Sequence, residues 1–125
     1  MKNLFNENGF GYRIENDSIT IIDYNHDSKN IIIPEKINGL PVKTIGNGAF
    51  YDNELTSVII PDSVKTIDDD AFAYNKLTSV IIPDSVKTID DYAFADNQLT
   101  NVVIPNSVKT IGENAFDKSV KIIRE

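Results

Sequence analysis

The chain has 125 residues, enough for one domain, and its 41% of hydrophobic residues argues against disorder. Its formal net charge of −7 disfavours nucleic acid and anionic membrane surfaces as partners, because both attract clustered Lys and Arg. It has no cysteine, which excludes disulfides, thiolate metal sites and cysteine nucleophiles.

The amino-terminal segment, residues 1–30, is predicted to form a cap. Residues 11–14 and 18–24 alternate apolar and polar side chains around residues 15–17, which is typical of a β-hairpin. No apolar stretch of secretory length precedes them. If Met1 is the natural start, we therefore expect a cytoplasmic protein; if the chain was trimmed, the cell surface or secretion is expected instead.

An irregular first repeat is predicted for residues 31–54. It begins with three isoleucines and Pro34 and reaches Ala49 and Phe50 with five residues more than the later copies have. Gly39 and Pro41 lie in this insertion, and both residue types favour turns. We expect the extra residues to bulge out of one coil.

Three regular repeats follow, at residues 55–76, 77–98 and 99–118. The first two differ only at the pairs Asp70/Tyr92, Tyr74/Asp96 and Lys76/Gln98. Self-similarity at a fixed period is the signature of a repeat architecture. The phenylalanines that mark the period are 22 residues apart: Phe50, Phe72, Phe94 and Phe116. Residues 119–125 interleave charged and apolar side chains and are predicted to form a last strand that caps the stack.

Within a repeat, period-two alternation predicts that Val58 and Ile60 point inward while Ser57 and Ile59 point outward. Pro61 cannot donate to a β-ladder and should end the strand. Val64, Ile67, Ala71 and Phe72 are expected inside, with a short turn of helix beginning at the acidic residues 68–70. One coil cannot bury these side chains alone, so each strand should pair with that of the next coil.

The pattern L-x-x-V-x-I-P-x-S-V-x-x-I-x-x-x-A-F resembles the BspA-like bacterial leucine-rich repeat family, also seen in treponemal surface proteins, over residues 10–123. The resemblance implies a β-rich, right-handed solenoid of about four 22-residue repeats with an N-terminal β-hairpin cap. It also implies a scaffold that binds proteins or host surfaces. Family repeats often carry cysteine where this chain has Asn53, Asn75 and Asn97, and secreted members usually have an export signal. We expect these asparagines to form a ladder between coils.

No residue pattern predicts catalysis, a metal or a cofactor. His26 lies in a polar stretch without a partner base and is interpreted as a solvated side chain. The acids at 68–70 and 90–91 lack the spacing of a calcium loop and are interpreted as helix-start charges or solvated acids. A Ser–Lys pair recurs in each coil, which a single active site does not require. These structural residues are Ser63, Ser85, Ser107, Lys43, Lys65, Lys87 and Lys109.

Two candidate protein-binding surfaces are predicted. Stacked outward apolar residues on the strand face, extended by Ile32, are typical of a binding surface, although β-branched residues also simply favour strands or could lie under another segment. This set is Ser57, Ile59, Ser79, Ile81, Asn101 and Val103. Tyr74 and Tyr92 occupy positions at which otherwise identical repeats differ. They are interpreted either as anchors of a protein interface or as neutral variation of the surface, with equal weight.

The predicted function is non-enzymatic binding of another protein, with no small-molecule substrate. We expect a small cytoplasmic binder that modulates or inhibits its partner. One example of such a protein would be encoded by a phage or other mobile element and would act on a host enzyme. The alternative is a surface or adhesin module excised from a larger secreted bacterial protein. An enzyme is the third and least favoured class.

Overall fold

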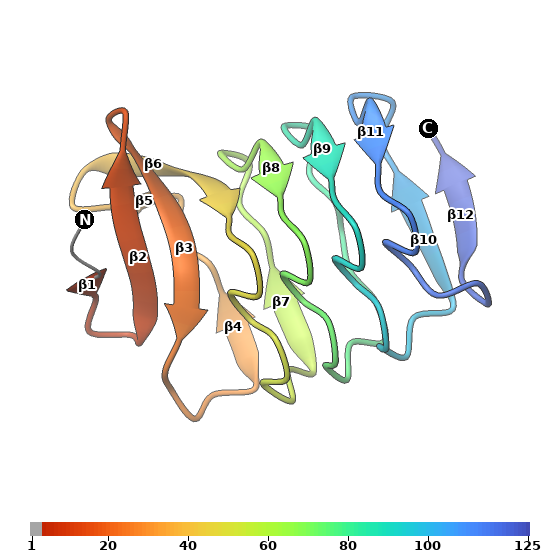
Figure 1. The fold of residues 1–125 in the computed structure, drawn as a ribbon, viewed down its shortest axis with the longest axis horizontal. Coiled ribbons are helices and arrows are strands. Elements are labelled where there is room, and N and C mark those ends of the chain that lie inside the picture. The colour runs from red at the N-terminus through yellow and green to blue at the C-terminus, as the bar shows by residue number, and fades with distance from the viewer. Residues whose placement is uncertain (1–3) are drawn as a thin grey trace.

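The structure, a computed structural model, describes residues 4–125, and that range folds into strands and turns without a helix. The chain winds into a stack of coils that run from the hairpin at one end to the last strand at the other (Figure 1). The predicted β-solenoid is therefore confirmed. Residues 1–3 of the predicted cap lie outside the described range.

The predicted N-terminal hairpin is present. Strands β2 (Phe10–Glu15) and β3 (Ser18–Tyr24) pair antiparallel, and β1 (Leu4–Phe5) adds to the outer side of β2. Asn16 and Asp17 between them have φ of 50° and 61°. A two-residue turn with both φ values positive matches the twist of a hairpin, and Asn and Asp tolerate that backbone better than most residues.

A continuous sheet runs along one face of the coils and was not predicted. It continues from β3 through parallel rungs that repeat the Thr-Ile pair, in the order β6 (Leu40–Ile45), β8 (Thr66–Ile67), β9 (Thr88–Ile89) and β11 (Thr110–Ile111). Both residue types are β-branched and suit strands. The hairpin is thus joined to the solenoid, because β3 is its first rung.

The insertion in the first repeat forms the predicted bulge. β5 (Lys36–Ile37) folds back antiparallel on β6. Asn38 and Gly39 make the turn between them with φ of 52° and 78°. The bulge leaves the parallel pairing of β6 with β8 intact, so the next coil stacks in normal register.

The second face carries the strands predicted from the L-x-x-V-x-I pattern, but its ladder is interrupted. β4 (Asn30–Ile32) pairs with β7 (Ser57–Ile59), and β10 (Asn101–Ile104) pairs with β12 (Lys121–Arg124). Residues 78–82 lie between these pairs and make no backbone hydrogen bond to any described residue. The prediction that every coil's strand pairs with the next is wrong here, although the sequence of this copy repeats that of β7.

The core lies between the two faces and is built from the positions the alternation predicted. The phenylalanines form a ladder with ring centroids 5.1–5.2 Å apart and nearly parallel planes. Each ring lies against the same ring of the next coil, so stacking alone shields it from water. In the coil that begins at residue 55 the buried side chains are Leu55, Val58, Ile60, Val64, Ile67, Ala71 and Phe72.

The helical turn predicted at residues 68–72 is not formed. The N–H of Ala71 donates to the carbonyl of Asp68 at 3.2 Å, and the N–H of Ala73 donates to that of Asp70 at 3.2 Å, which makes two consecutive tight turns. Asp70 has a φ of 57°. A left-handed residue in the middle of the segment stops a right-handed helix from propagating.

Candidate protein-binding surfaces

The predicted outward side chains of the strand face do form one row, which we call the apolar stripe. Cross-strand pairing places Ile32 beside Ile59. The stripe continues through Ile81 to Val103, and the exposed fractions of the four side chains are 69%, 59%, 84% and 44% in that order. β-Branched side chains that stand this far into water contribute little to the core, although their inward neighbours Val58 and Ile60 are buried.

Polar side chains line one edge of the stripe. Ser57, Ser79 and Asn101 are exposed two residues before each stripe residue, as the alternation predicted. Ser57 donates its hydroxyl to Oδ1 of Asn30 at 2.8 Å. The structure therefore brings the six predicted strand-face residues onto one surface.

Two grooves flank Ile81 where the ladder is interrupted. The groove between β7 and residues 79–81 has a volume of about 260 Å³, and the one between residues 79–82 and β10 has about 270 Å³. Val80 lines both. Sites for drug-sized ligands are usually larger, at roughly 300–1,000 Å³, so these grooves suit individual side chains of a protein partner better.

Tyr74 and Tyr92 are both exposed, and neither lines the grooves around Ile81. Tyr74 lies against Tyr51, with ring centroids 5.3 Å apart, and both rings are about half exposed. The carboxylate of Asp96 beside Tyr74 raises the pKa of its phenol, because a nearby negative charge disfavours the phenolate.

The backbone at both predicted tyrosines is left-handed, with φ of 59° at Tyr74 and 62° at Tyr92. The matching positions of neighbouring coils hold the residues that tolerate this conformation best: Gly48, Asp52, Asp70, Asp96 and Asn114. The position pattern in the sequence could not show this strain. A bulky residue at such a φ is an outlier, so tyrosine is not the residue type that either turn favours.

Replacing Tyr92 with asparagine should stabilise the protein. Asn114 shows that asparagine fits this turn, and relief of the left-handed strain is expected to raise the free energy of unfolding by up to about 1 kcal/mol. Urea denaturation followed by circular dichroism measures the change. Tyr51→Asn is the matched control, because Tyr51 is similarly exposed but has no positive φ; an equal gain there would contradict the explanation.

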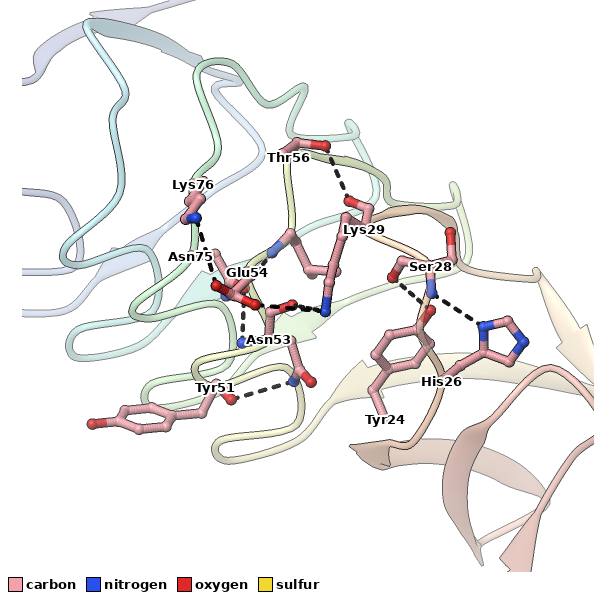
Figure 2. Close-up of polar contacts among 11 residues, drawn as sticks. Tyr24, His26, Ser28, Lys29, Tyr51, Asn53, Glu54, Thr56, Asn75 and Lys76 are labelled. Atoms are coloured by element: carbon pink, nitrogen blue, oxygen red, sulfur yellow. Dashed lines mark hydrogen bonds and ion pairs between the residues drawn. The ribbon is translucent and has the colours of Figure 1, made fainter.

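The predicted asparagine ladder is present in two of its three members. Asn75 is buried, and its Oδ1 accepts from the N–H of Asn53 at 3.1 Å (Figure 2) and from the N–H of Leu55 at 2.9 Å. Its Nδ2 donates to the carbonyl of Phe50 at 2.8 Å. Asn97 repeats this arrangement one coil later by bonding the N–H of Leu77. The amide of Asn53 instead donates to the carbonyl of Tyr51 in its own coil, so it does not continue the ladder.

Charged side chains form ion pairs at the same corner of the coils. Glu54 lies between Lys29 and Lys76, with N···O distances of 3.9 and 3.5 Å, and Nζ of Lys29 donates to the carbonyl of Asn53 at 3.2 Å (Figure 2). These side chains are 44–60% exposed, so each pair contributes little to stability. The cluster joins coils and presents no reactive group.

His26 and the three repeat serines, which were considered for chemistry, lie in different surroundings. His26 is exposed, and its Nδ1 accepts from the N–H of Ser28 at 3.2 Å (Figure 2). The hydroxyls of Ser63, Ser85 and Ser107 are buried without a described hydrogen-bond partner. Across residues 4–125, no three His, Cys, Asp or Glu side chains are grouped to hold a metal ion, and no helix is long and apolar enough to cross a membrane.

Asp68 and Asp90 occupy the same position in adjacent coils and are close enough to share a hydrogen bond. Partial burial, followed by the facing Asp90, raises the pKa of Asp68 from 3.8 to about 6, and Asp69 and Glu15 act in the same direction. Because this pKa is raised in the folded state, the folded protein binds more protons than the unfolded chain between these two values. This pair's contribution to stability therefore falls as pH rises from about 4 to about 6.

Replacing Asp68 with asparagine should remove that pH dependence. We expect the variant to gain melting temperature over the wild type at pH 7 and to gain less at pH 4, where the wild-type carboxyl is already protonated. Thermal denaturation at the two pH values measures this. Asp52→Asn makes the same change in net charge but is not among the groups facing Asp68; a gain confined to the Asp68 variant at neutral pH is the expected pattern.

Stacked coils with an outward row of apolar side chains on a strand face define a β-solenoid of the leucine-rich repeat class. The chain belongs to the family described as the BspA type leucine rich repeat region, whose model matches residues 14–123 in six copies. The match begins inside the hairpin, in agreement with β3 being the first rung of the sheet. Comparison with curated proteins gives no match.

Solved structures of bacterial leucine-rich repeat proteins are similar to this chain. A leucine-rich repeat protein from Bacteroides capillosus is 26% identical with a TM-score of 0.85, and the match covers 98% of each chain. The T. pallidum leucine-rich repeat protein is 27% identical with a TM-score of 0.77, over 96% of this chain and 64% of that one. The pneumococcal vaccine antigen PcpA, at 23% identity and a TM-score of 0.77 over 99% of this chain and 38% of its own, shares the fold.

Proposed function

We propose that this chain is a non-enzymatic binding module that engages one protein partner through the apolar stripe. The observation that carries the proposal is the row of exposed side chains at Ile32, Ile59, Ile81 and Val103 on a rigid repeat scaffold. Contiguous exposed apolar side chains on a stable protein mark an interaction surface, because leaving them in water has no benefit for the fold.

Membership of a leucine-rich repeat family supports a protein partner, since such repeats serve as protein-interaction modules. A preformed surface also loses little conformational entropy on binding. We extend the proposal to a cytoplasmic protein that binds its target stoichiometrically and inhibits it, the target being a host enzyme and the source a phage or other mobile element. The acidic balance of the chain suits a target with a basic surface.

A second candidate function is a binding module within a longer surface protein. It is favoured by one observation, that this chain spans less than two thirds of the T. pallidum relative and of PcpA. In both candidates the apolar stripe binds a protein. They differ in whether the natural partner is an intracellular enzyme or a molecule outside the cell.

Affinity capture with a stripe variant tests the function. The variant carries Ile59→Asp, Ile81→Asp and Val103→Asp, and it should fold normally because all three side chains point into water. We expect the wild-type chain to capture a partner in a one-to-one complex by native mass spectrometry, and the variant to lose it. Assay of the captured partner with and without the chain then tests inhibition.

The control for the capture changes three exposed lysines that recur in adjacent coils. Lys65→Gln, Lys87→Gln and Lys109→Gln alter net charge by the same three units as the stripe variant but leave the stripe intact. The partner should be retained. If the stripe variant holds the partner as well as this control does, the stripe is not the binding surface.

A further inference from the structure

The two edges of the apolar stripe differ in charge. The edge formed by Asn30 and the polar residues Ser57, Ser79 and Asn101 has no carboxylate, and it continues into the exposed Lys121, which is paired beside Asn101. The opposite edge, where each coil leaves the strand face, carries exposed carboxylates: Glu35, Asp62, Asp84 and Glu125. Asp84 and Glu125 also line the groove between residues 79–82 and β10. A partner that fits the stripe therefore meets negative charge along one side only.

These four carboxylates are free to pair with a partner. Within residues 4–125 the ion pairs are Arg13–Glu15, Lys29–Glu54 and Lys76–Glu54, and none involves the acidic edge. Arg124, which precedes Glu125 in the sequence, donates from its guanidinium to the carbonyl of Val108 at 2.8 Å. The surface is complementary to Lys or Arg side chains, which would also be attracted by the net charge of −7.

The distance between successive coils matches the repeat distance of an α-helix better than that of a β-strand. The stacked phenylalanines put successive coils 5.1–5.2 Å apart in the core. With the same spacing taken for the strand face, an α-helix, which rises about 5.4 Å per turn, would drift by less than about 1 Å over the three steps from Ile32 to Val103. Same-face residues of a β-strand repeat at roughly 6.6–6.8 Å and would drift by about 4.5 Å over the same steps.

The backbone groups of residues 78–82 are unpaired, but these residues lie between β7 and β10. An added strand would therefore have to insert between neighbouring coils, where the grooves are only about 260 and 270 Å³. The grooves on either side of Ile81 instead accept side chains from above the sheet. Successive turns of one helix can fill both grooves, because i and i+4 side chains are about 5–6 Å apart.

From these observations we propose that the stripe binds an amphipathic α-helix of the partner protein, laid along the solenoid axis across the strands. Its apolar i, i+3, i+4 and i+7 side chains pack around Ile81, and its Lys or Arg side chains lie on one flank, against Asp62 and Asp84. This inference rests on the proposed function and specifies the segment that is recognised. It predicts Lys or Arg residues on one flank of the helix only.

Selection from two peptide libraries tests the proposal. One library displays 16-residue helix-forming peptides and the other displays extended peptides with period-two alternation, both randomised and both selected on the full-length chain. We expect binders from the helical library only, with apolar residues at helical spacing and Lys or Arg on one flank. A selected peptide should bind the wild-type chain in fluorescence anisotropy and lose at least tenfold in affinity with Ile81→Asp.

The acidic edge is tested with the same selected peptide. Asp62→Asn, Asp84→Asn and Glu125→Gln together should weaken binding roughly tenfold at low salt, because each exposed pair contributes a small amount. They should also flatten the salt dependence of the affinity. Glu7→Gln, Asp17→Asn and Asp52→Asn remove the same charge from exposed positions that line neither groove around Ile81 and should change the affinity by less than twofold.

Several outcomes would overturn the proposal. They are enrichment of extended peptides, helical binders without a basic flank, no binder at all, or equal effects of the two charge variants. A wild-type dimer in sedimentation that Ile81→Asp returns to monomer would assign the stripe to a second copy of the chain. If the natural partner is still captured through the stripe but by an extended or acidic segment, mapped by hydrogen exchange, the proposed function stands and this inference fails.

Discussion

Replacing Phe72 with alanine is expected to lower the free energy of unfolding by about 3–5 kcal/mol, the usual cost of removing a buried aromatic ring. Phe72 is fully buried and stacks on Phe50 and Phe94 at 5.1 and 5.2 Å. Its loss leaves a cavity that interrupts the aromatic ladder between two coils. Denaturant unfolding followed by circular dichroism measures the loss.

The terminal ring of the ladder is the matched control. Phe116 is 8% exposed and stacks on Phe94 alone, so Phe116→Ala should cost clearly less than the central substitution. The variants should also differ in cooperativity, because a stack of repeats is held by interfaces between neighbours. Loss of the Phe72 ring weakens the coupling between the coils on its two sides, whereas loss of the Phe116 ring affects only the terminal coil. Equal costs at the two positions would contradict nearest-neighbour stacking as the source of stability.

Removal of the Asn75 amide should destabilise the protein almost as much, although the side chain is small. Asn75→Ala leaves the N–H of Leu55 and the carbonyl of Phe50 without their partners inside the stack. The same amide also serves Phe72 and Ala73. Each buried group left unpaired costs about 1–3 kcal/mol, so we expect a loss of about 3 kcal/mol in denaturant unfolding.

Asn53→Ala is the matched control, because Asn53 occupies the same repeat position as Asn75 but makes no hydrogen bond of the ladder with its amide group. The Asn53 amide makes one bond, to the carbonyl of Tyr51 at 3.3 Å, and lies at a more exposed position than Asn75. Its replacement should cost less than about 1 kcal/mol. Amide hydrogen exchange gives a second readout, since protection of the Leu55 N–H should fall in the Asn75 variant only. A large effect at Asn53 would show that the hydrogen bonds to the preceding coil are not what stabilises this corner.

Stability and binding are assigned to different side chains of the same repeat. The phenylalanine and asparagine ladders hold coil to coil, and Ile59, Ile81 and Tyr92 lie outside them. The Tyr92→Asn variant is expected to stabilise the fold, while the stripe substitutions are expected to leave it intact. Side chains that are neutral or unfavourable for folding, yet large and apolar, are the ones to examine first for a partner.

Much of the fold could be predicted because the repeat makes the sequence redundant. The 22-residue interval between phenylalanines and the inward pattern of Val58 and Ile60 are local properties, and each recurs often enough to be unambiguous. The hairpin turn at Asn16 and Asp17 and the bulge at Gly39 were likewise predictable, since these residue types favour backbone that others avoid.

Other features depend on how neighbouring coils meet, which no single repeat encodes. Residues 79–82 repeat the sequence of Ser57–Ile60, yet only the earlier copy pairs, because its neighbour β4 lies close enough for hydrogen bonds. Variation between otherwise identical copies marks the position of Tyr92, but its left-handed backbone, with a φ of 62°, is a property of the folded coil. The helical turn expected to begin at residues 68–70 does not form, because the backbone of Asp70 is also left-handed.

The sequence by itself determined the unit: its length, its inward and outward positions and its tendency to stack, all set by side-chain chemistry within one coil. The tertiary structure alone decided which coils hydrogen-bond, where the grooves around Ile81 open, and that acidic side chains line only one edge of the stripe. The physical reason is distance. Alternation of side chains is fixed over a few residues of chain, whereas ladders, grooves and charge asymmetry arise between segments 22 or more residues apart, whose separation is set by the packing of the whole stack.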